Sequence, residues 1–142
     1  MKNSNRIVTV IALLLTSILW SCDENSNSSP DNSTPILKEG IWIISNFNED
    51  GQDQTNYFSG YSFDFQEAGV VKATSGTSIV SGTWGIRKDS GKTKLDLNFG
   101  NVPKFEELNE DWEIMTQNST KIDLKDVSGG DGDISYLTFE KN

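Results

Sequence analysis

Apolar and polar residues alternate with a period of two over most of this chain, from residue 36 to residue 142. In the clearest run, Leu95, Leu97 and Phe99 alternate with charged or amide side chains. This period places every second side chain on one face of a β-strand, whereas an amphipathic helix needs a longer period. The alternation predicts strands near residues 40–47, 56–65, 70–74, 79–87, 93–99, 111–117, 120–126 and 134–140.

The connectors between these runs are short and contain the residues that tight turns need. Glycine adopts positive φ without strain, and it recurs between the predicted strands in Asp50-Gly51, Ala68-Gly69, Ser75-Gly76, Ser90-Gly91 and Gly129-Gly130. Short connectors make consecutive strands antiparallel neighbours, and closing the sheet removes its exposed edges. We therefore expect an all-β fold, an eight-stranded antiparallel up-and-down barrel. A two-sheet β-sandwich is the alternative, because alternation alone fits both.

One connector has a different pattern and predicts a short helix between the fifth and sixth strands. In residues 101–108, Asn101 is a candidate N-cap and Pro103 suits the first turn. Phe105 and Leu108 are three residues apart and share a face of such a helix. We expect these two side chains to plug one end of the barrel. A lid over a ligand opening is the alternative.

The first 21 residues have the pattern of a targeting signal. Lys2 and Arg6 precede an apolar run at residues 7–19, which is shorter than the roughly 20 residues of a membrane span. The run ends at Leu19-Trp20-Ser21-Cys22, which resembles the lipobox of bacterial lipoproteins. The resemblance implies that Cys22, the only cysteine, is acylated and becomes the mature N-terminus. The alternatives are a transmembrane anchor and a signal peptide that is cleaved elsewhere.

A polar segment follows the cysteine. Residues 23–35 contain no apolar side chain except two prolines, so burial cannot offset the entropy lost on ordering. We expect residues 22–36 to be a disordered tether and residues 37–142 to be the folded domain. Asp23-Glu24 resembles a signal that sends some Gram-negative lipoproteins to the outer face, although a plain linker explains it equally well. The expected location is the bacterial outer membrane, on a face that the sequence leaves open.

The motif Gly40-Ile41-Trp42 opens the first predicted strand, and Gly82-Thr83-Trp84 repeats the pattern later. With the aromatic run at residues 58–65, these motifs are similar to the small lipocalin-like domains of bacterial lipoproteins, over residues 38–141. The resemblance implies that Trp42 packs across the base of the barrel and that Gly40 permits close backbone approach. The Thr-Asp-Tyr motif of larger lipocalins is absent, and Lys141 stands nearest to the place of their stacking arginine.

Composition excludes several chemistries. The chain has 142 residues, one cysteine and no histidine, so it lacks Ser-His-Asp or Cys-His catalysis, imidazole-bound zinc and an internal disulfide. Its formal charge of −9 removes the usual electrostatic drive for nucleic-acid binding. Loops 48–53 and 131–133 have oxygen ligands at spacings that suit calcium but lack the EF-hand pattern, so we expect hairpin turns there.

Carboxylates also cluster in the connector before the sixth predicted strand: Glu106, Glu107, Glu110 and Asp111. Paired carboxylates perform acid–base hydrolysis when the environment raises one pKa. Nothing in the local sequence indicates such an environment, so we expect a solvated acidic face. We predict that the chain is not an enzyme and has no cofactor or metal.

Aromatic side chains are the candidates for a ligand site in the barrel interior: Trp42, Tyr61, Phe63, Trp84, Phe99 and Trp112. These rings either fill the interior or line a pocket within it. The leading interpretation is a lipid-anchored envelope lipoprotein that binds a small apolar ligand. The alternative is a solid barrel with a structural or protein-interaction role and no ligand. The expected partners are the membrane, an apolar ligand or an envelope protein.

Overall fold

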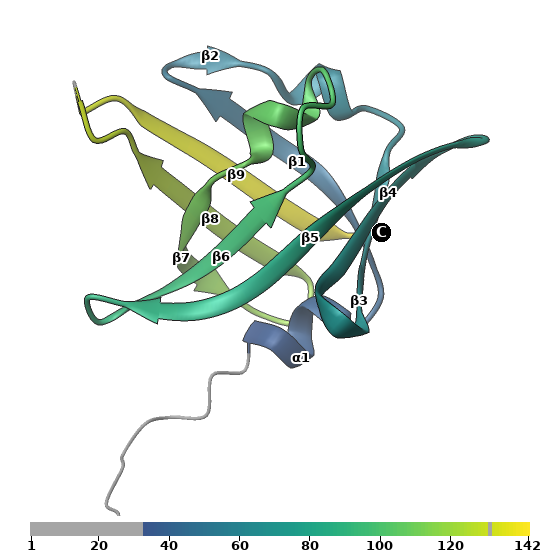
Figure 1. The fold of residues 1–142 in the computed structure, drawn as a ribbon, viewed down its shortest axis with the longest axis horizontal. Helices are drawn as coiled ribbons and strands as arrows, with labels where there is room; N and C mark the ends of the chain where they lie inside the picture. Colours follow the sequence, from purple (N-terminus) through teal and green to yellow (C-terminus); the bar gives the residue numbers. More distant parts are fainter. Residues whose placement is uncertain (1–32, 131) are drawn as a thin grey trace, which may run out of the picture.

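The alternating runs form strands that each pair with two neighbours in a computed structural model, which describes residues 33–130 and 132–142 (Figure 1). The sheet order β2-β1-β3-β4-β5-β6-β7-β8-β9 closes through pairing of β1 with β9, which gives an eight-stranded antiparallel barrel with β2 as an addition at one edge. The barrel predicted from alternation is confirmed, and the sandwich is not formed. The strands are β1 (Ile41–Glu49), β2 (Gln52–Asp53), β3 (Ser62–Gln66), β4 (Val70–Ser75), β5 (Ser78–Asp89), β6 (Lys92–Asn98), β7 (Asp111–Gln117), β8 (Lys121–Val127) and β9 (Ile134–Lys141).

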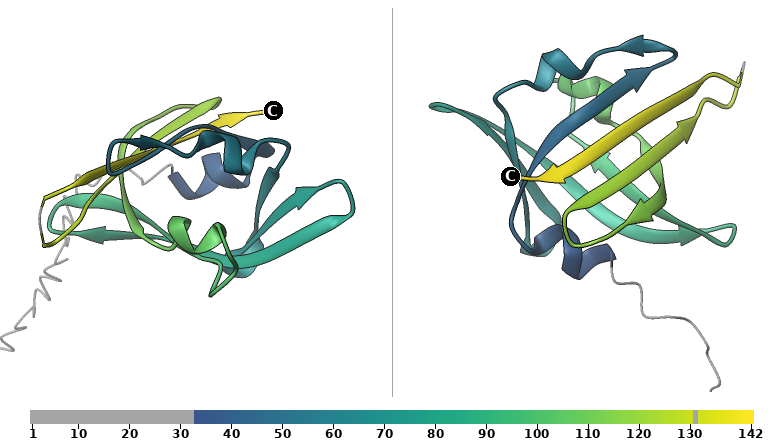
Figure 2. Two further views of the ribbon diagram at one scale, coloured as in Figure 1. Left: turned by 90° about the horizontal axis from the view of Figure 1, so that it is seen from above. Right: turned by 180° about the vertical axis from the view of Figure 1, so that it is seen from behind.

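Strand β1 closes the barrel, because it pairs with β9 on one side and with β3 on the other. Its pairing with β9 extends from Trp42 to Asn48, with one irregularity after Ile44. Its pairing with β3 covers only Ile41 and Trp42, so the two strands separate beyond that point. Figure 2 shows from above and from behind how the strands surround one interior.

Short helical segments lie at both ends of the barrel: α1 (Ser33–Lys38), η1 (Thr55–Phe58), η2 (Glu67–Gly69) and η3 (Phe105–Leu108). Figure 1 places α1 below the strands and η3 above them. Phe105 and Leu108 of η3 are both buried, and Phe105 packs against the rings of Phe58, Tyr61 and Phe99. The helix predicted between the fifth and sixth strands is therefore η3, a single 3-10 turn that plugs its end of the barrel.

One predicted strand, 56–65, is wrong in its first half. Residues Thr55–Phe58 form the 3-10 turn η1 instead, and β3 begins only at Ser62. Gly60 has a φ of +82°, which breaks the extended conformation between the two segments. Phe58 lies in the turn η1 and is still buried in the core. An apolar residue at this position therefore does not indicate a strand.

Helix α1 was not expected. It begins at Ser33, inside the segment 22–36 that we predicted as a tether. Leu37 is fully buried, and its carbonyl accepts a hydrogen bond of 2.8 Å from the indole of Trp42. Contacts with the end of the barrel thus stabilise a six-residue helix that is too short to be stable alone.

The predicted signal peptide at residues 1–21 and the predicted acylation site Cys22 lie outside the described residues. Within residues 33–130 and 132–142, none of the helices is long and apolar enough to cross a membrane.

Candidate functional site

The aromatic residues proposed as a ligand site belong to the hydrophobic core of the barrel or pack against it. Phe63 lies at their centre, with ring centroids of Phe139 and Phe99 at 5.3 and 6.3 Å in edge-to-face contact. Such contacts are the preferred geometry of aromatic pairs and stabilise a core beyond the area they bury. Five of the six candidates are buried and the sixth is half-buried: Trp42, Phe63, Trp84, Phe99, Trp112 and, half-buried, Tyr61. These side chains are therefore part of a packed aromatic core, and the two cavities described below lie at its edges.

The tryptophan indoles fix the segments that close the barrel. Within residues 33–142, each of the three indole N–H groups donates a hydrogen bond to a backbone carbonyl in or next to a helical segment: Trp42 to Leu37 at 2.8 Å, Trp84 to Gln66 at 3.0 Å and Trp112 to Leu108 at 3.1 Å. A buried indole N–H without a partner would cost the free energy of its desolvation. The tryptophans thus connect the strands to α1, η2 and η3.

At the Gly-x-Trp motif, Trp42 is buried as expected, whereas the close approach at Gly40 is made by a side chain and not by backbone. Trp42 lies at the base of the barrel, and the ammonium of Lys141 lies 5.5 Å from its ring centroid. Gly40 has a φ of +114°, and a Cβ built there would lie 2.9 Å from Cε of Lys141. Lys141 therefore takes the position over the tryptophan, and Gly40 leaves room for its side chain.

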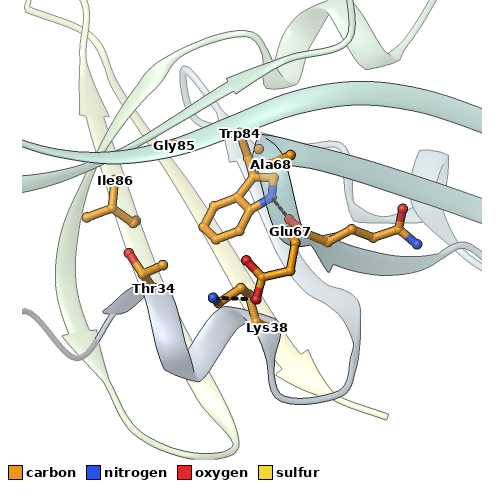
Figure 3. A pocket seen from close by; sticks show the side chains of 9 residues that line it. Thr34, Lys38, Glu67, Ala68, Trp84, Gly85 and Ile86 are labelled. Atoms are coloured by element: carbon orange, nitrogen blue, oxygen red, sulfur yellow. Dashed lines mark hydrogen bonds and ion pairs between the residues drawn. The ribbon is translucent and has the colours of Figure 1, made fainter.

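A first cavity lies at the base of the barrel between α1, η2 and β5 (Figure 3). Its volume is about 270 Å³. Figure 3 shows the indole of Trp84 and the side chain of Ile86 directed into it from β5, with Thr34 of α1 alongside. The ammonium of Lys38 and the carboxylate of Glu67 form an ion pair of 2.8 Å at its rim. The cavity therefore combines an apolar floor with charged groups of both signs.

A second cavity of about 310 Å³ lies where β1 and β3 separate. Ile44, Phe58 and Tyr61 contribute apolar surface to it, and Gly60 lines it with backbone. The cavity is a depression in the wall of the barrel beside the aromatic core. Tyr61 is the predicted site residue that it includes, and Trp84 is the one that the first cavity includes.

Two carboxyl groups meet at the end of the barrel that η3 plugs. The pKa of Glu49 at the end of β1 is raised from 4.5 to about 7, first by burial and then by a hydrogen bond with Glu107 and by its charge. Burial of a carboxyl group and a second acidic group beside it both disfavour its ionised form. Our expectation that nothing raises a pKa in the sequence cluster at residues 106–111 is wrong for one member, Glu110, whose pKa is also raised. Glu107 itself is exposed, and neither cavity is lined by this pair.

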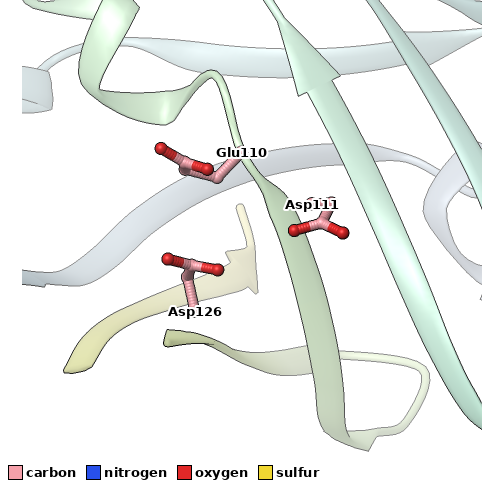
Figure 4. A group of neighbouring side chains, drawn as sticks. All are labelled: Glu110, Asp111 and Asp126. Carbon is pink, nitrogen blue, oxygen red and sulfur yellow. The ribbon is translucent and has the colours of Figure 1, made fainter. Parts of the chain in front are cut away.

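A second acidic group lies on the outside of the barrel (Figure 4). Carboxylate oxygens of Glu110, Asp111 and Asp126 lie within 4.8 Å of one another. Burial and then the charges of the two aspartates raise the pKa of Glu110. Arg87 donates a hydrogen bond to Asp111, and Lys94 lies 3.7 Å from the same carboxylate. These cations compensate part of the negative charge, so the group belongs to an ion-pair network of the surface.

No protein-family model matches this sequence, and neither does any curated protein. Solved structures resemble the fold. A DUF4847 family protein from Bacteroides vulgatus is 17% identical, has a TM-score of 0.52, and is matched over 76% of this chain and 96% of its own. The likeness shows the barrel. An uncharacterized protein from Bacteroides eggerthii is 12% identical, has a TM-score of 0.43, and is matched over 71% of this chain and 97% of its own.

Sequence reasoning did not find the first cavity, because its residues come from separate elements. Lys38 belongs to α1, Glu67 to η2 and Trp84 to β5, and no local motif joins them. The signal that was present is the second Gly-x-Trp motif. This motif predicted that Trp84 belongs to the barrel interior, whereas the structure places it at the floor of a peripheral cavity.

Proposed function

We propose that this chain is a lipid-anchored lipoprotein of the bacterial outer membrane. Its barrel is a filled scaffold that binds partners on its outer surface. The observation that carries the proposal is the filled interior. A barrel of eight strands either packs its interior with side chains or holds one small ligand there. Here Phe63 and its neighbouring rings occupy that space, which leaves the surface for binding.

The lipid anchor in this proposal rests on the sequence. Cys22 is the only cysteine, and it stands at the position that the lipobox pattern requires. Several acyl chains at one residue would give stable membrane attachment, since each buried CH₂ contributes about 0.8 kcal/mol. The polar segment after Cys22 would then separate the barrel from the membrane.

A protein partner is supported by an exposed apolar strip on the hairpin of β8 and β9. Val127 and Ile134 are cross-strand neighbours, and Tyr136 follows on the same face. All three side chains are exposed to solvent. Apolar groups that gather on an outer face mark interaction surfaces more often than single exposed ones do.

The anchor is tested by expressing the full chain and its Cys22→Ala variant in a Gram-negative host. We expect the wild type to fractionate with membranes and to carry acyl mass, and the variant to lose both. Ser26→Ala, a substitution of the same size in the same segment, is the control and should behave as the wild type. Unchanged fractionation and mass in Cys22→Ala would refute the anchor.

The filled scaffold is tested separately by native mass spectrometry of the full chain purified from its own host. We expect the mass of the acylated chain without an apolar adduct. A stoichiometric apolar molecule that survives washing would show instead that the barrel carries a ligand in its interior.

A further inference from the structure

We propose that the cavity between α1, η2 and β5 binds one neutral polyhydroxylated ring, such as a sugar unit of a glycan. The site lies outside the filled core, and the inference does not depend on the lipid anchor. It deepens the proposed function, because it assigns a ligand class to one part of the outer surface. Three features of the cavity favour this ligand class: its floor, its rim and its size (Figure 3).

The floor is a rigid aromatic surface. The indole N–H of Trp84 is already used by the carbonyl of Gln66 at 3.0 Å, so the ring offers only apolar contact to a ligand. Phe65 supports the ring from the core, with centroids 5.4 Å apart and planes at 83°. A side chain held in place before binding loses little freedom when a ligand arrives. The C–H face of a sugar ring is apolar and matches such a floor.

The backbone of η2 is shaped to lie against Trp84. Gly69 has a φ of +74°, and a Cβ built there would lie 2.9 Å from the carbonyl oxygen of Trp84. Any other residue at this position would push the turn away from β5. The glycine therefore keeps Glu67, two residues earlier, close to the indole.

The rim favours a neutral ligand with hydroxyl groups. Lys38 and Glu67 compensate each other at 2.8 Å, so a charged ligand would have to separate an existing ion pair. Hydroxyl groups can instead add hydrogen bonds to the remaining lone pairs of the carboxylate and the remaining N–H groups of the ammonium. Hydrogen bonds with a charged partner are the stronger class. The side chain of Thr34 adds a further donor and acceptor at the same rim.

The size of the cavity restricts the ligand to a single ring. Its volume of about 270 Å³ is near the lower end of the ~300–1,000 Å³ of sites for drug-sized ligands. A ring with its substituents occupies such a space, and further units of a chain would extend into solvent. We therefore expect weak binding of one unit, with dissociation constants on the order of 1 mM.

The test uses ¹H–¹⁵N spectra of the full chain in detergent, titrated with methyl glycosides of glucose, galactose and N-acetylglucosamine. Trp84→Phe identifies the indole signal of Trp84. With at least one glycoside we expect this signal to shift in a saturable manner, while those of Trp42 and Trp112 stay in place. Absence of a saturable shift with all three glycosides would overturn the proposal. So would a response to a zwitterion such as glycine betaine without any response to the glycosides.

Variants of the rim make the test specific. Thr34→Tyr places a bulky side chain beside the cavity and should weaken binding about tenfold or more, and Glu67→Gln should weaken it about threefold. Glu113→Gln is the matched control, because Glu113 forms an ion pair of 2.7 Å with Lys92 elsewhere on the barrel. Equal affinity in Thr34→Tyr, or an equal loss in the control, would contradict the assignment. Neither result bears on the anchor or on the filled interior, which the preceding experiments test.

Discussion

The indole N–H of Trp112 donates a hydrogen bond of 3.1 Å to the carbonyl of Leu108, and both side chains are fully buried. This contact joins β7 to the turn η3 that plugs the barrel. It parallels the bond between Trp42 and Leu37 at the opposite end, where α1 lies. The two ends of the barrel are thus closed by the same device, a core tryptophan that binds the backbone of a short helical segment.

Trp112→Phe removes this hydrogen bond and part of a buried ring. We expect the free energy of unfolding to fall by about 2–4 kcal/mol, because a buried hydrogen bond is lost and a cavity remains where the larger ring was. The Leu108 carbonyl keeps its second donor, the backbone N–H of Glu110 at 2.9 Å. Urea unfolding followed by circular dichroism measures the change. Tyr136→Phe, on the exposed face of β9, is the control and should change stability by less than about 0.5 kcal/mol. Similar losses in both variants would contradict the role of Trp112.

Gly82→Ala and Gly85→Ala should differ although both lie in β5. A Cβ at Gly82 would lie 2.6 Å from the carbonyl oxygen of Asn98, whereas one at Gly85 meets nothing within 4 Å. We expect Gly82→Ala to destabilise by about 1–3 kcal/mol through overpacking. Gly85→Ala should be neutral or stabilise by about 0.4–1 kcal/mol, because alanine restricts the unfolded chain. Thermal and urea unfolding of both variants give the comparison, and equal effects would refute it.

The raised pKa of Glu49 predicts a loss of stability as pH rises. The folded protein binds the proton of Glu49 more tightly than the unfolded chain does. The stabilisation that this proton gives is therefore fully present below pH 4.5 and is lost as pH rises through about 7. The side chain is partly open to solvent, so screening reduces the effect to the order of 1 kcal/mol. Unfolding free energies across this range should fall less in Glu49→Gln than in the wild type.

The control for this prediction is Glu106→Gln, which removes a carboxylate from the same turn as Glu107 without touching the pair. Its pH dependence should follow that of the wild type. If Glu49→Gln also follows the wild type, then burial and the neighbouring Glu107 do not raise the pKa of Glu49 in the folded protein.

Phe105→Ala tests the plug at the η3 end. Phe105 packs 5.0 Å from Phe99 and 5.4 Å from Phe58, measured between ring centroids. We expect a loss of about 3–5 kcal/mol, the usual cost of removing a buried phenylalanine ring. Met115→Ala on the exposed side of β7 should have little effect. A small loss in Phe105→Ala would indicate that η3 is a loosely held lid and not a plug.

Much of the barrel could be predicted because each strand has one buried face. Leu95, Leu97 and Phe99 are buried as their alternation predicts, and so are Ile122 and Leu124. Turns with glycine at positive φ then fix the antiparallel order. The sequence could not show α1, because Leu37 is stabilised by a tryptophan of the barrel and not by neighbours in its own helix.

The candidate site was less accessible to sequence reasoning. Trp84 was found through its motif, but its role depends on Lys38 and Glu67, which tertiary structure alone brings to the same rim. The pair of Glu49 and Glu107 was missed for the same reason. A pKa depends on burial and on neighbours in space, and the two residues come from opposite sides of the chain's midpoint.

Pairing between β1 and β9 brings the last residue beside the start of the barrel, where the backbone N–H of Asn142 donates a 2.9 Å hydrogen bond to the carbonyl of Ile41. In a closed sheet of this kind, the chain ends could lie between any two neighbouring strands. A circular permutant that joins residue 142 to residue 33 through an added linker and opens the tight turn at Gly91 would keep the strand pairs of the sheet. The chain ends could therefore be moved to another hairpin of this barrel while its interior stays the same.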